Sequence, residues 1–147
     1  VNAALAQLIS SADTAPVDSG KLGAIGFCFG GATALELARS GANIAAVVSF
    51  HGNLATELPA KAGELKAKVL AMNGADDSYV PAAQIDAFNQ EMQAAGADWQ
   101  FVNFGGAVHC FAESDANSGP GCLYNERAAK RAFRMMRDFF DEAFAAQ

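Results

Sequence analysis

The chain has 147 residues, of which 52% are apolar and 18% charged, and this composition excludes a disordered chain. Its 16 acidic and 10 basic residues give a formal net charge of −6, so a nucleic-acid partner is not expected. The longest charge-free apolar stretch, residues 22–35, is interrupted by four glycines and is shorter than the roughly 20 residues of a membrane span. We therefore expect one folded domain over residues 1–147 and no membrane partner.

The first half of the chain alternates helix and strand patterns. Residues 2–10 predict a short helix, and the apolar run at 21–27 predicts a strand buried on both faces, as parallel strands are. A helix over residues 30–40 follows directly. Residues 44–50 predict a second buried strand, and residues 52–66 a loop.

The second half continues this alternation. Residues 67–72 predict a third strand, Pro81 opens a helix in the first-turn position, and residues 98–104 alternate as a fourth strand. The loop at 105–124 has a length more typical of functional loops, and a last helix is expected over 126–145. Together these elements predict an α/β fold: a parallel sheet of about four strands with flanking helices.

A tight strand-to-helix turn contains the first chemical motif. Residues 26–30 read G-x-C-x-G, the cysteine form of the nucleophile elbow. Gly26 and Gly30 are expected to keep Cβ atoms away where the chain packs on itself. The following helix favours a thiolate at Cys28, and the N–H of Phe29 is placed to stabilise an oxyanion. On this motif alone, a buried and inert cysteine is the alternative.

An acid and a histidine follow the elbow in the order used by α/β-hydrolases. Asp76 and Asp77 come directly after the third strand, and His109 follows the fourth, whereas His51 precedes both aspartates. Each candidate lies at the carboxyl end of a successive strand. A turn aspartate and a surface histidine are the structural alternatives, but three matching residue types in this order favour a catalytic triad with Cys28.

Five segments of the sequence resemble the dienelactone hydrolase family of α/β-hydrolases, from about Gly20 to the C-terminus. They are GFCFGG at 26–31, VVSFHG at 47–52, NGADDSYVP at 73–81, GGAVHCF at 105–111 and YNERAAKRAFRMMRDFF at 124–140. The resemblance implies that Cys28 is the nucleophile and that His109, ahead of a small residue and Phe, is the base. It implies Asp77 as the acid, because Asp77 opens the family's Asp-x-x-Val-Pro run.

The implied activity is hydrolysis of a small carboxylic ester or lactone through an acyl-thioester, without cofactor or metal. Members that hydrolyse dienelactone itself have an Arg four residues after the histidine, where this chain has Glu113. A different substrate is therefore expected. The candidates for the substrate pocket are His51, Phe111, Glu113 and Tyr124.

The resemblance also implies strands before the elbow strand, and the 27 residues ahead of Cys28 are too few to hold them. We therefore expect the C-terminal portion of an α/β-hydrolase fold. Its first strand would then be an exposed, uncharged edge at residues 22–27, which predicts self-association or pairing with an N-terminal portion.

The three cysteines are too few and too odd in number for a disulfide framework. With no signal-peptide pattern in residues 1–10, they favour a reducing, cytoplasmic location. Cys110 and Cys122 are expected as packed thiols in preference to a zinc site shared with His109. Asn125 is placed to cap the final helix.

Two other functions stay open. Glutamine amidotransferases also place G-x-C-x-G on an α/β sheet, but they pair the cysteine with His-x-Glu, whereas His109 is followed by Cys110 and Phe111. The second alternative is an inactive fragment that acts as an association module. Ester turnover that is lost when Cys28 is blocked would separate the hydrolase from both.

Overall fold

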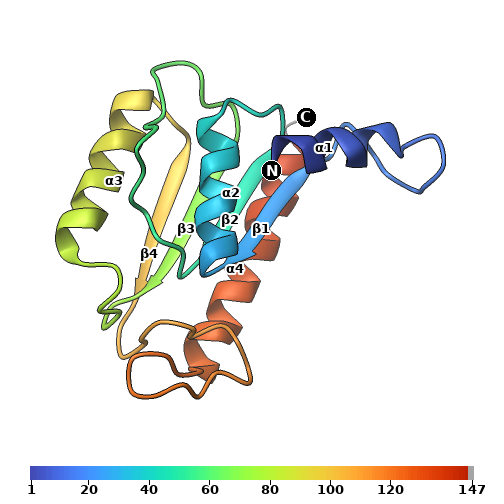
Figure 1. Cartoon of the computed structure of the whole chain (residues 1–147). Helices are drawn as coiled ribbons and strands as arrows, with labels where there is room; N and C mark the ends of the chain where they lie inside the picture. The colour runs from blue at the N-terminus through green and yellow to red at the C-terminus, as the bar shows by residue number, and fades with distance from the viewer. Residues whose placement is uncertain (146–147) are drawn as a thin grey trace.

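The structure, a computed structural model, describes residues 1–145, and its centre is a parallel sheet of four strands (Figure 1). The strands lie side by side in chain order: β1 (Gly23–Phe27), β2 (Ala46–Phe50), β3 (Lys68–Gly74) and β4 (Trp99–Phe104). Each neighbouring pair is parallel. The predicted α/β class and its four strands are confirmed, and the carboxyl ends of all four strands meet at one edge.

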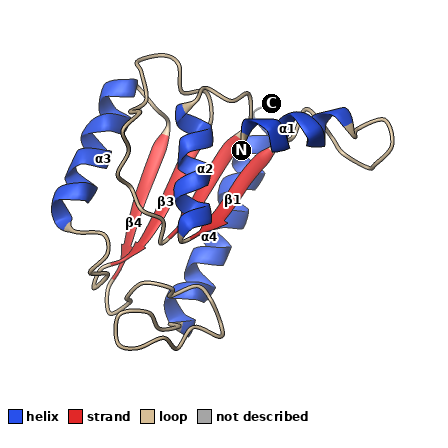
Figure 2. Cartoon of the chain, in the orientation of Figure 1, coloured by secondary structure: helices blue, strands red, loops and turns tan. Residues whose placement is uncertain are grey.

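Helices cover both faces of this sheet (Figure 2). Helices α2 (Phe29–Arg39) and α3 (Ala82–Ala95) lie on one face, and α4 (Glu126–Ala145) lies on the other. Helix α1 (Asn2–Ser10) forms as predicted but buries none of its residues. Among residues 1–145, no helix has the length and hydropathy needed to cross a membrane.

The two central strands alternate their side chains between two apolar layers. Val47 of β2 pairs in register with Val69 of β3, and both pack on the side of α2 and α3. Val48 pairs with Leu70, and both pack on the side of α4. Because both faces of these strands are covered, their sequences are almost continuously apolar, as predicted.

Strand β1 differs from the prediction of a strand buried on both faces. Gly26 is its one buried residue, and the side chain of Ile25 is 50% exposed. The reason is topological: β1 lies at the end of the sheet and pairs with β2 alone among the described residues. The edge expected along residues 22–27 is therefore present.

The helix ends follow local backbone chemistry. Asn125 caps α4 as predicted, because its Oδ1 accepts the N–H of Ala128 at 3.1 Å. Gly96 ends α3 in the left-handed conformation, at a φ of +67°. Pro81 was expected inside the first turn of α3 but is its N-cap residue, with extended backbone angles.

Candidate active site

The turn between β1 and α2 holds Cys28 in a strained backbone conformation, at a φ of +48°. The glycine before it is required by packing, because a Cβ on Gly26 would overlap the carbonyl of Gly30. The expectation was wrong for Gly30, where a Cβ would meet no atom within 4 Å. The close approach of β1 and α2 therefore requires Gly26, and also Gly31, where a Cβ would lie 3.1 Å from the carbonyl oxygen of Gly26.

Phe29 is the first residue of α2, a position whose N–H has no partner within the helix. Its side chain is 86% exposed and so takes no part in the core. The backbone N–H of Cys28 itself is directed to the carbonyl of Phe50 at 3.1 Å and to Nδ1 of His51 at 3.3 Å. These bonds tie the elbow to the end of β2.

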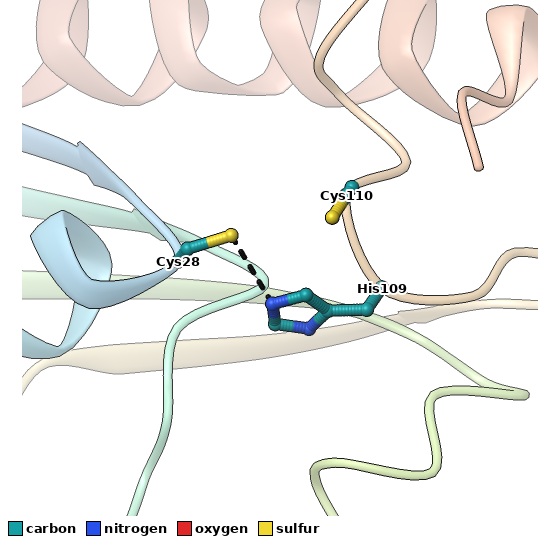
Figure 3. A group of neighbouring side chains, drawn as sticks. All are labelled: Cys28, His109 and Cys110. Carbon is teal, nitrogen blue, oxygen red and sulfur yellow. Dashed lines mark hydrogen bonds between the residues drawn. The ribbon is translucent and has the colours of Figure 1, made fainter. Parts of the chain in front are cut away.

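Three of the predicted site residues meet at the carboxyl edge of the sheet. The Sγ of Cys28 lies 3.1 Å from Nε2 of His109 (Figure 3), and Nδ1 of His109 lies 2.7 Å from Oδ2 of Asp77. The Asp77 side chain is buried and its Oδ1 accepts the N–H of Tyr79 at 2.8 Å, whereas Asp76 is exposed. The geometry thus distinguishes the two neighbouring aspartates.

Two further side chains touch the same sulfur. Nδ1 of His51 and Oε1 of Glu113 each lie 3.3 Å from Sγ of Cys28. His51 is fully buried, and Glu113 is 39% exposed in its side chain. The sequence marked both as pocket candidates but gave no sign that either contacts Cys28. The His51 contact arises where β2 ends beside the elbow, and the Glu113 contact depends on how the loop at 105–124 folds back.

This environment keeps the resting sulfur protonated. Burial, then the hydrogen bond and negative charge of Glu113, raise the pKa of Cys28 to about 11. Burial and the neighbouring His109 lower the pKa of His51 to about 4, so His51 is neutral at pH 7. The raised pKa of Cys28 runs against the expectation that the N-terminus of α2 favours a thiolate there.

The other two pocket candidates, Phe111 and Tyr124, differ in exposure. Phe111 is fully buried and packs edge-on against His51. It therefore supports His51 from within the core and has no surface exposed to a substrate. Tyr124 is 37% exposed and lines a hollow of about 550 Å³ together with Phe133 and Arg134 of α4. That hollow adjoins the loop containing Glu113, since Ala112 and Ser114 also line it.

Cys110 and Cys122 form a disulfide, which overturns the prediction of two packed thiols. They meet because the long loop doubles back, with the N–H of Leu123 donating to the carbonyl of His109 at 3.1 Å. The two cysteines are 12 residues apart within one irregular loop, and no periodic pattern in the sequence indicated that they would meet. The disulfide also removes the argument from cysteine usage for a reducing compartment.

Within residues 1–145, donor atoms that could hold a metal ion gather in two sets, each within 4.8 Å, and both sets include Cys28. His109 and Cys110 complete the first set (Figure 3), but the sulfur of Cys110 is already bonded to Cys122. His51 and Glu113 complete the second, around a thiol whose raised pKa opposes the thiolate that a metal would require. Neither set fits a metal centre well.

Comparison with known proteins gives a consistent result. The model of the dienelactone hydrolase family matches residues 1–144. An uncharacterized protein of Caenorhabditis elegans is 39% identical over 136 residues, which are 88% of this chain and 84% of that protein. A putative carboxymethylenebutenolidase of Yersinia pestis is 32% identical over 133 residues, which are 85% of this chain and 48% of that protein.

Solved structures agree with the family match. A dienelactone hydrolase-like promiscuous phosphotriesterase from metagenomic libraries superposes with a TM-score of 0.85 at 41% identity, over 92% of this chain and 58% of that one. The solved chain m3DLH gives a TM-score of 0.83 at 43% identity, over 97% of this chain and 62% of that one. The chain spans about half the length of the bacterial relatives that it matches. On this family match over residues 1–144, the chain belongs to the dienelactone hydrolase family.

Proposed function

We propose that the chain contains the catalytic triad of a hydrolase for small carboxylic esters or lactones, with Cys28 as nucleophile, His109 as base and Asp77 as the acid. The observation that supports this most directly is the chain of contacts from Sγ through the imidazole to the buried carboxylate, at 3.1 Å and 2.7 Å. Nucleophile, base and orienting group within hydrogen-bond reach are the signature of covalent catalysis.

In the proposed reaction, Sγ of Cys28 attacks the carbonyl carbon while its proton passes to Nε2 of His109. Asp77 accepts the Nδ1–H of His109 and stabilises the imidazolium. The N–H of Phe29, at the start of α2, donates to the developing oxyanion. The alkoxide leaves with the proton from His109, and a water deprotonated by His109 then hydrolyses the thioester, returning acid and free thiol.

The substrate is proposed to be uncharged near the reacting carbonyl. The carboxylate of Glu113 lies 3.3 Å from the sulfur, in a chain of net charge −6, and repels an anionic substrate at this point. A neutral methyl ester should therefore be hydrolysed faster than the corresponding free carboxylate. One solved relative is named a promiscuous phosphotriesterase, and neutral phosphotriesters are a second class of probe.

The carboxylate partner of His109 favours a hydrolase over a glutamine amidotransferase. In the amidotransferase pattern the acid stands two residues after the histidine, where this chain has Phe111. Here the Nδ1 of His109 contacts Asp77, from the loop after β3. Release of ammonia from glutamine would nevertheless be measured beside ester turnover, because it is the product specific to that alternative.

The exposed edge supports the proposal that this chain pairs along β1, with a second copy or with an N-terminal portion of the family fold. A groove of about 470 Å³ lies beside that edge, lined by Leu22 and Ile25 on the strand side and by Met136 and Phe140 on α4. Unpaired strand edges recruit further strands. Light scattering at increasing concentration tests this: a strictly monomeric chain contradicts self-association.

The test of the proposed activity is turnover of p-nitrophenyl acetate by the chain and by its Cys28→Ala variant. We expect slow turnover by the chain and none above background by the variant. Cys28→Ser is the matched control for folding, since it retains the size and polarity of the side chain. Equal turnover by the chain and both variants would contradict the proposal.

A further inference from the structure

His51 is one of three residues other than glycine that have a positive φ within residues 1–145, and the other two are Cys28 and Cys110. Such strain persists where the surrounding structure enforces it, and it concentrates at functional sites. Two of these residues, Cys28 and His51, lie in direct contact although they leave different strands. The proposed triad assigns no role to His51.

The position of His51 is fixed from several sides. It follows β2 directly, with a φ of +40°, and its backbone N–H donates to the carbonyl of Met72 at 2.8 Å. The next residue is Gly52, where a Cβ would crowd the backbone of Ala32 in α2. The backbone at Gly52 is therefore packed against the first turn of α2. This packing holds the imidazole of His51 in contact with Cys28.

Its contacts determine which ring nitrogen carries the proton. The imidazole is neutral because burial lowers the pKa of His51 to about 4, so it has one N–H and one lone pair. Nδ1 faces the backbone N–H of Cys28, a donor, and so must accept. The proton is then on Nε2, which has no hydrogen-bond partner within the described residues and lies 3.7 Å from Oε1 of Glu113.

We propose that His51 is a positioning residue for the nucleophile: its Nδ1 lone pair holds the strained backbone of Cys28 and thereby aims Sγ at His109. This inference rests on one part of the proposed function, the assignment of Cys28 as the nucleophile. The titratable groups that act on His51 are Cys28, His109, Glu113 and Asp77. The accepting tautomer follows from the contact of Nδ1 with the N–H of Cys28.

The tautomer can be measured without any substrate. Imidazole ¹⁵N NMR at pH 7 should show His51 as a neutral ring protonated on Nε2, with the signal assigned by its loss in His51→Asn. A ring protonated on Nδ1, or a fully protonated ring at pH 7, would overturn the proposal. Because this measurement uses the resting protein, it is independent of whether the chain hydrolyses esters.

Two amide variants separate positioning from simple packing. Asn can place its Oδ1 where Nδ1 of His51 lies, whereas the longer Gln places its amide near the Nε2 position. We expect His51→Asn to retain the wild-type rate of iodoacetamide labelling at Cys28 and a kcat close to wild type. His51→Gln should lose about 10²-fold in kcat with a smaller change in KM, as expected for a misaimed nucleophile.

The thermal unfolding of His51→Asn and His51→Gln is measured beside these rates, to confirm that both variants are folded. Equal kcat and equal labelling of His51→Asn and His51→Gln would overturn the positioning role, whether both are active or both inactive. If the wild-type chain does not hydrolyse esters at all, the proposed function fails, while the labelling rates and the tautomer still decide the role of His51.

Discussion

Nε2 of His109 lies 3.1 Å from Sγ of Cys28, although 81 residues separate them in the chain. The parallel sheet explains this contact, because Cys28 follows β1 and His109 follows β4, and both strands end at the same edge. The second ring nitrogen of His109 is held by Asp77 at 2.7 Å. The imidazole is thus oriented between a sulfur and a buried carboxylate.

The two neighbouring aspartates offer a matched test of this orientation. Asp77→Asn should lower kcat by about 10⁴-fold, as loss of the orienting carboxylate does in a serine-protease triad. Asp76→Asn should leave kcat unchanged, because Asp76 is exposed and the Nδ1 contact belongs to Asp77. Steady-state kinetics with p-nitrophenyl acetate measure both. A larger loss of kcat in Asp76→Asn than in Asp77→Asn would show that Asp77 is not the acid.

Replacing Glu113 should make the thiol more acidic. The hydrogen bond and charge of Glu113 both raise the pKa of Cys28, so Glu113→Gln should move it from about 11 toward its ordinary value of 9.0. It should not reach that value, because burial is the larger cause and persists. The pH dependence of iodoacetamide labelling reports this pKa, and labelling near pH 9 should become faster.

Asp115→Asn is the control for this change, since Asp115 is an exposed carboxylate in the same loop. The pH dependence of iodoacetamide labelling at Cys28 should be the same in Asp115→Asn as in the wild type. An unchanged profile in Glu113→Gln would mean that the carboxylate does not contact the thiol in solution.

Much of this architecture could be predicted from local patterns. The alternation of apolar runs with amphipathic segments located all four strands, and Asn125 marked the start of α4. The rule that parallel strands end at one edge, with the α/β-hydrolase order of nucleophile, acid and histidine, selected Cys28, His109 and the Asp76–Asp77 pair, and the family resemblance chose Asp77. These features follow from short-range periodicity and from strand topology, both of which are visible in a single sequence.

What the sequence could not reveal depends on the fold of one long loop. The disulfide between Cys110 and Cys122 and the contact of Glu113 with Cys28 both arise where residues 105–124 turn back on themselves. No periodic pattern encodes such turns. The exposure of β1 was also missed in the strand prediction, because an apolar run has the same appearance at an edge as in the centre of a sheet.

The elbow makes different demands on its two glycines. Gly26→Ala should destabilise or prevent folding, since the added Cβ would overlap the backbone of Gly30. Gly30→Ala has open space and lies in α2, where alanine is favoured over glycine by roughly 0.5–1 kcal/mol. Urea unfolding of the two variants measures the difference. A Gly26→Ala variant as stable as Gly30→Ala would contradict the close approach of β1 and α2.

The buried imidazole should make folding sensitive to mild acid. The pKa of His51 is lowered from 6.5 to about 4, so between these values the unfolded chain binds a proton that the folded chain does not. The stability is therefore fully present above pH 6.5 and is lost as the pH falls, by about 3 kcal/mol near pH 4. His51→Asn should show a smaller loss over the same window in urea unfolding, and an identical loss would contradict a buried, neutral His51.

The measurement that tests the central claim most directly is trapping of the acyl-enzyme. The chain is mixed with p-nitrophenyl acetate, quenched in acid, and its peptides are analysed by mass spectrometry. We predict an acetyl group on the peptide containing Cys28 and no acetyl group at this position in the Cys28→Ala variant. Acetylation confined to lysines, or turnover that continues after Cys28 has been alkylated, would contradict the account.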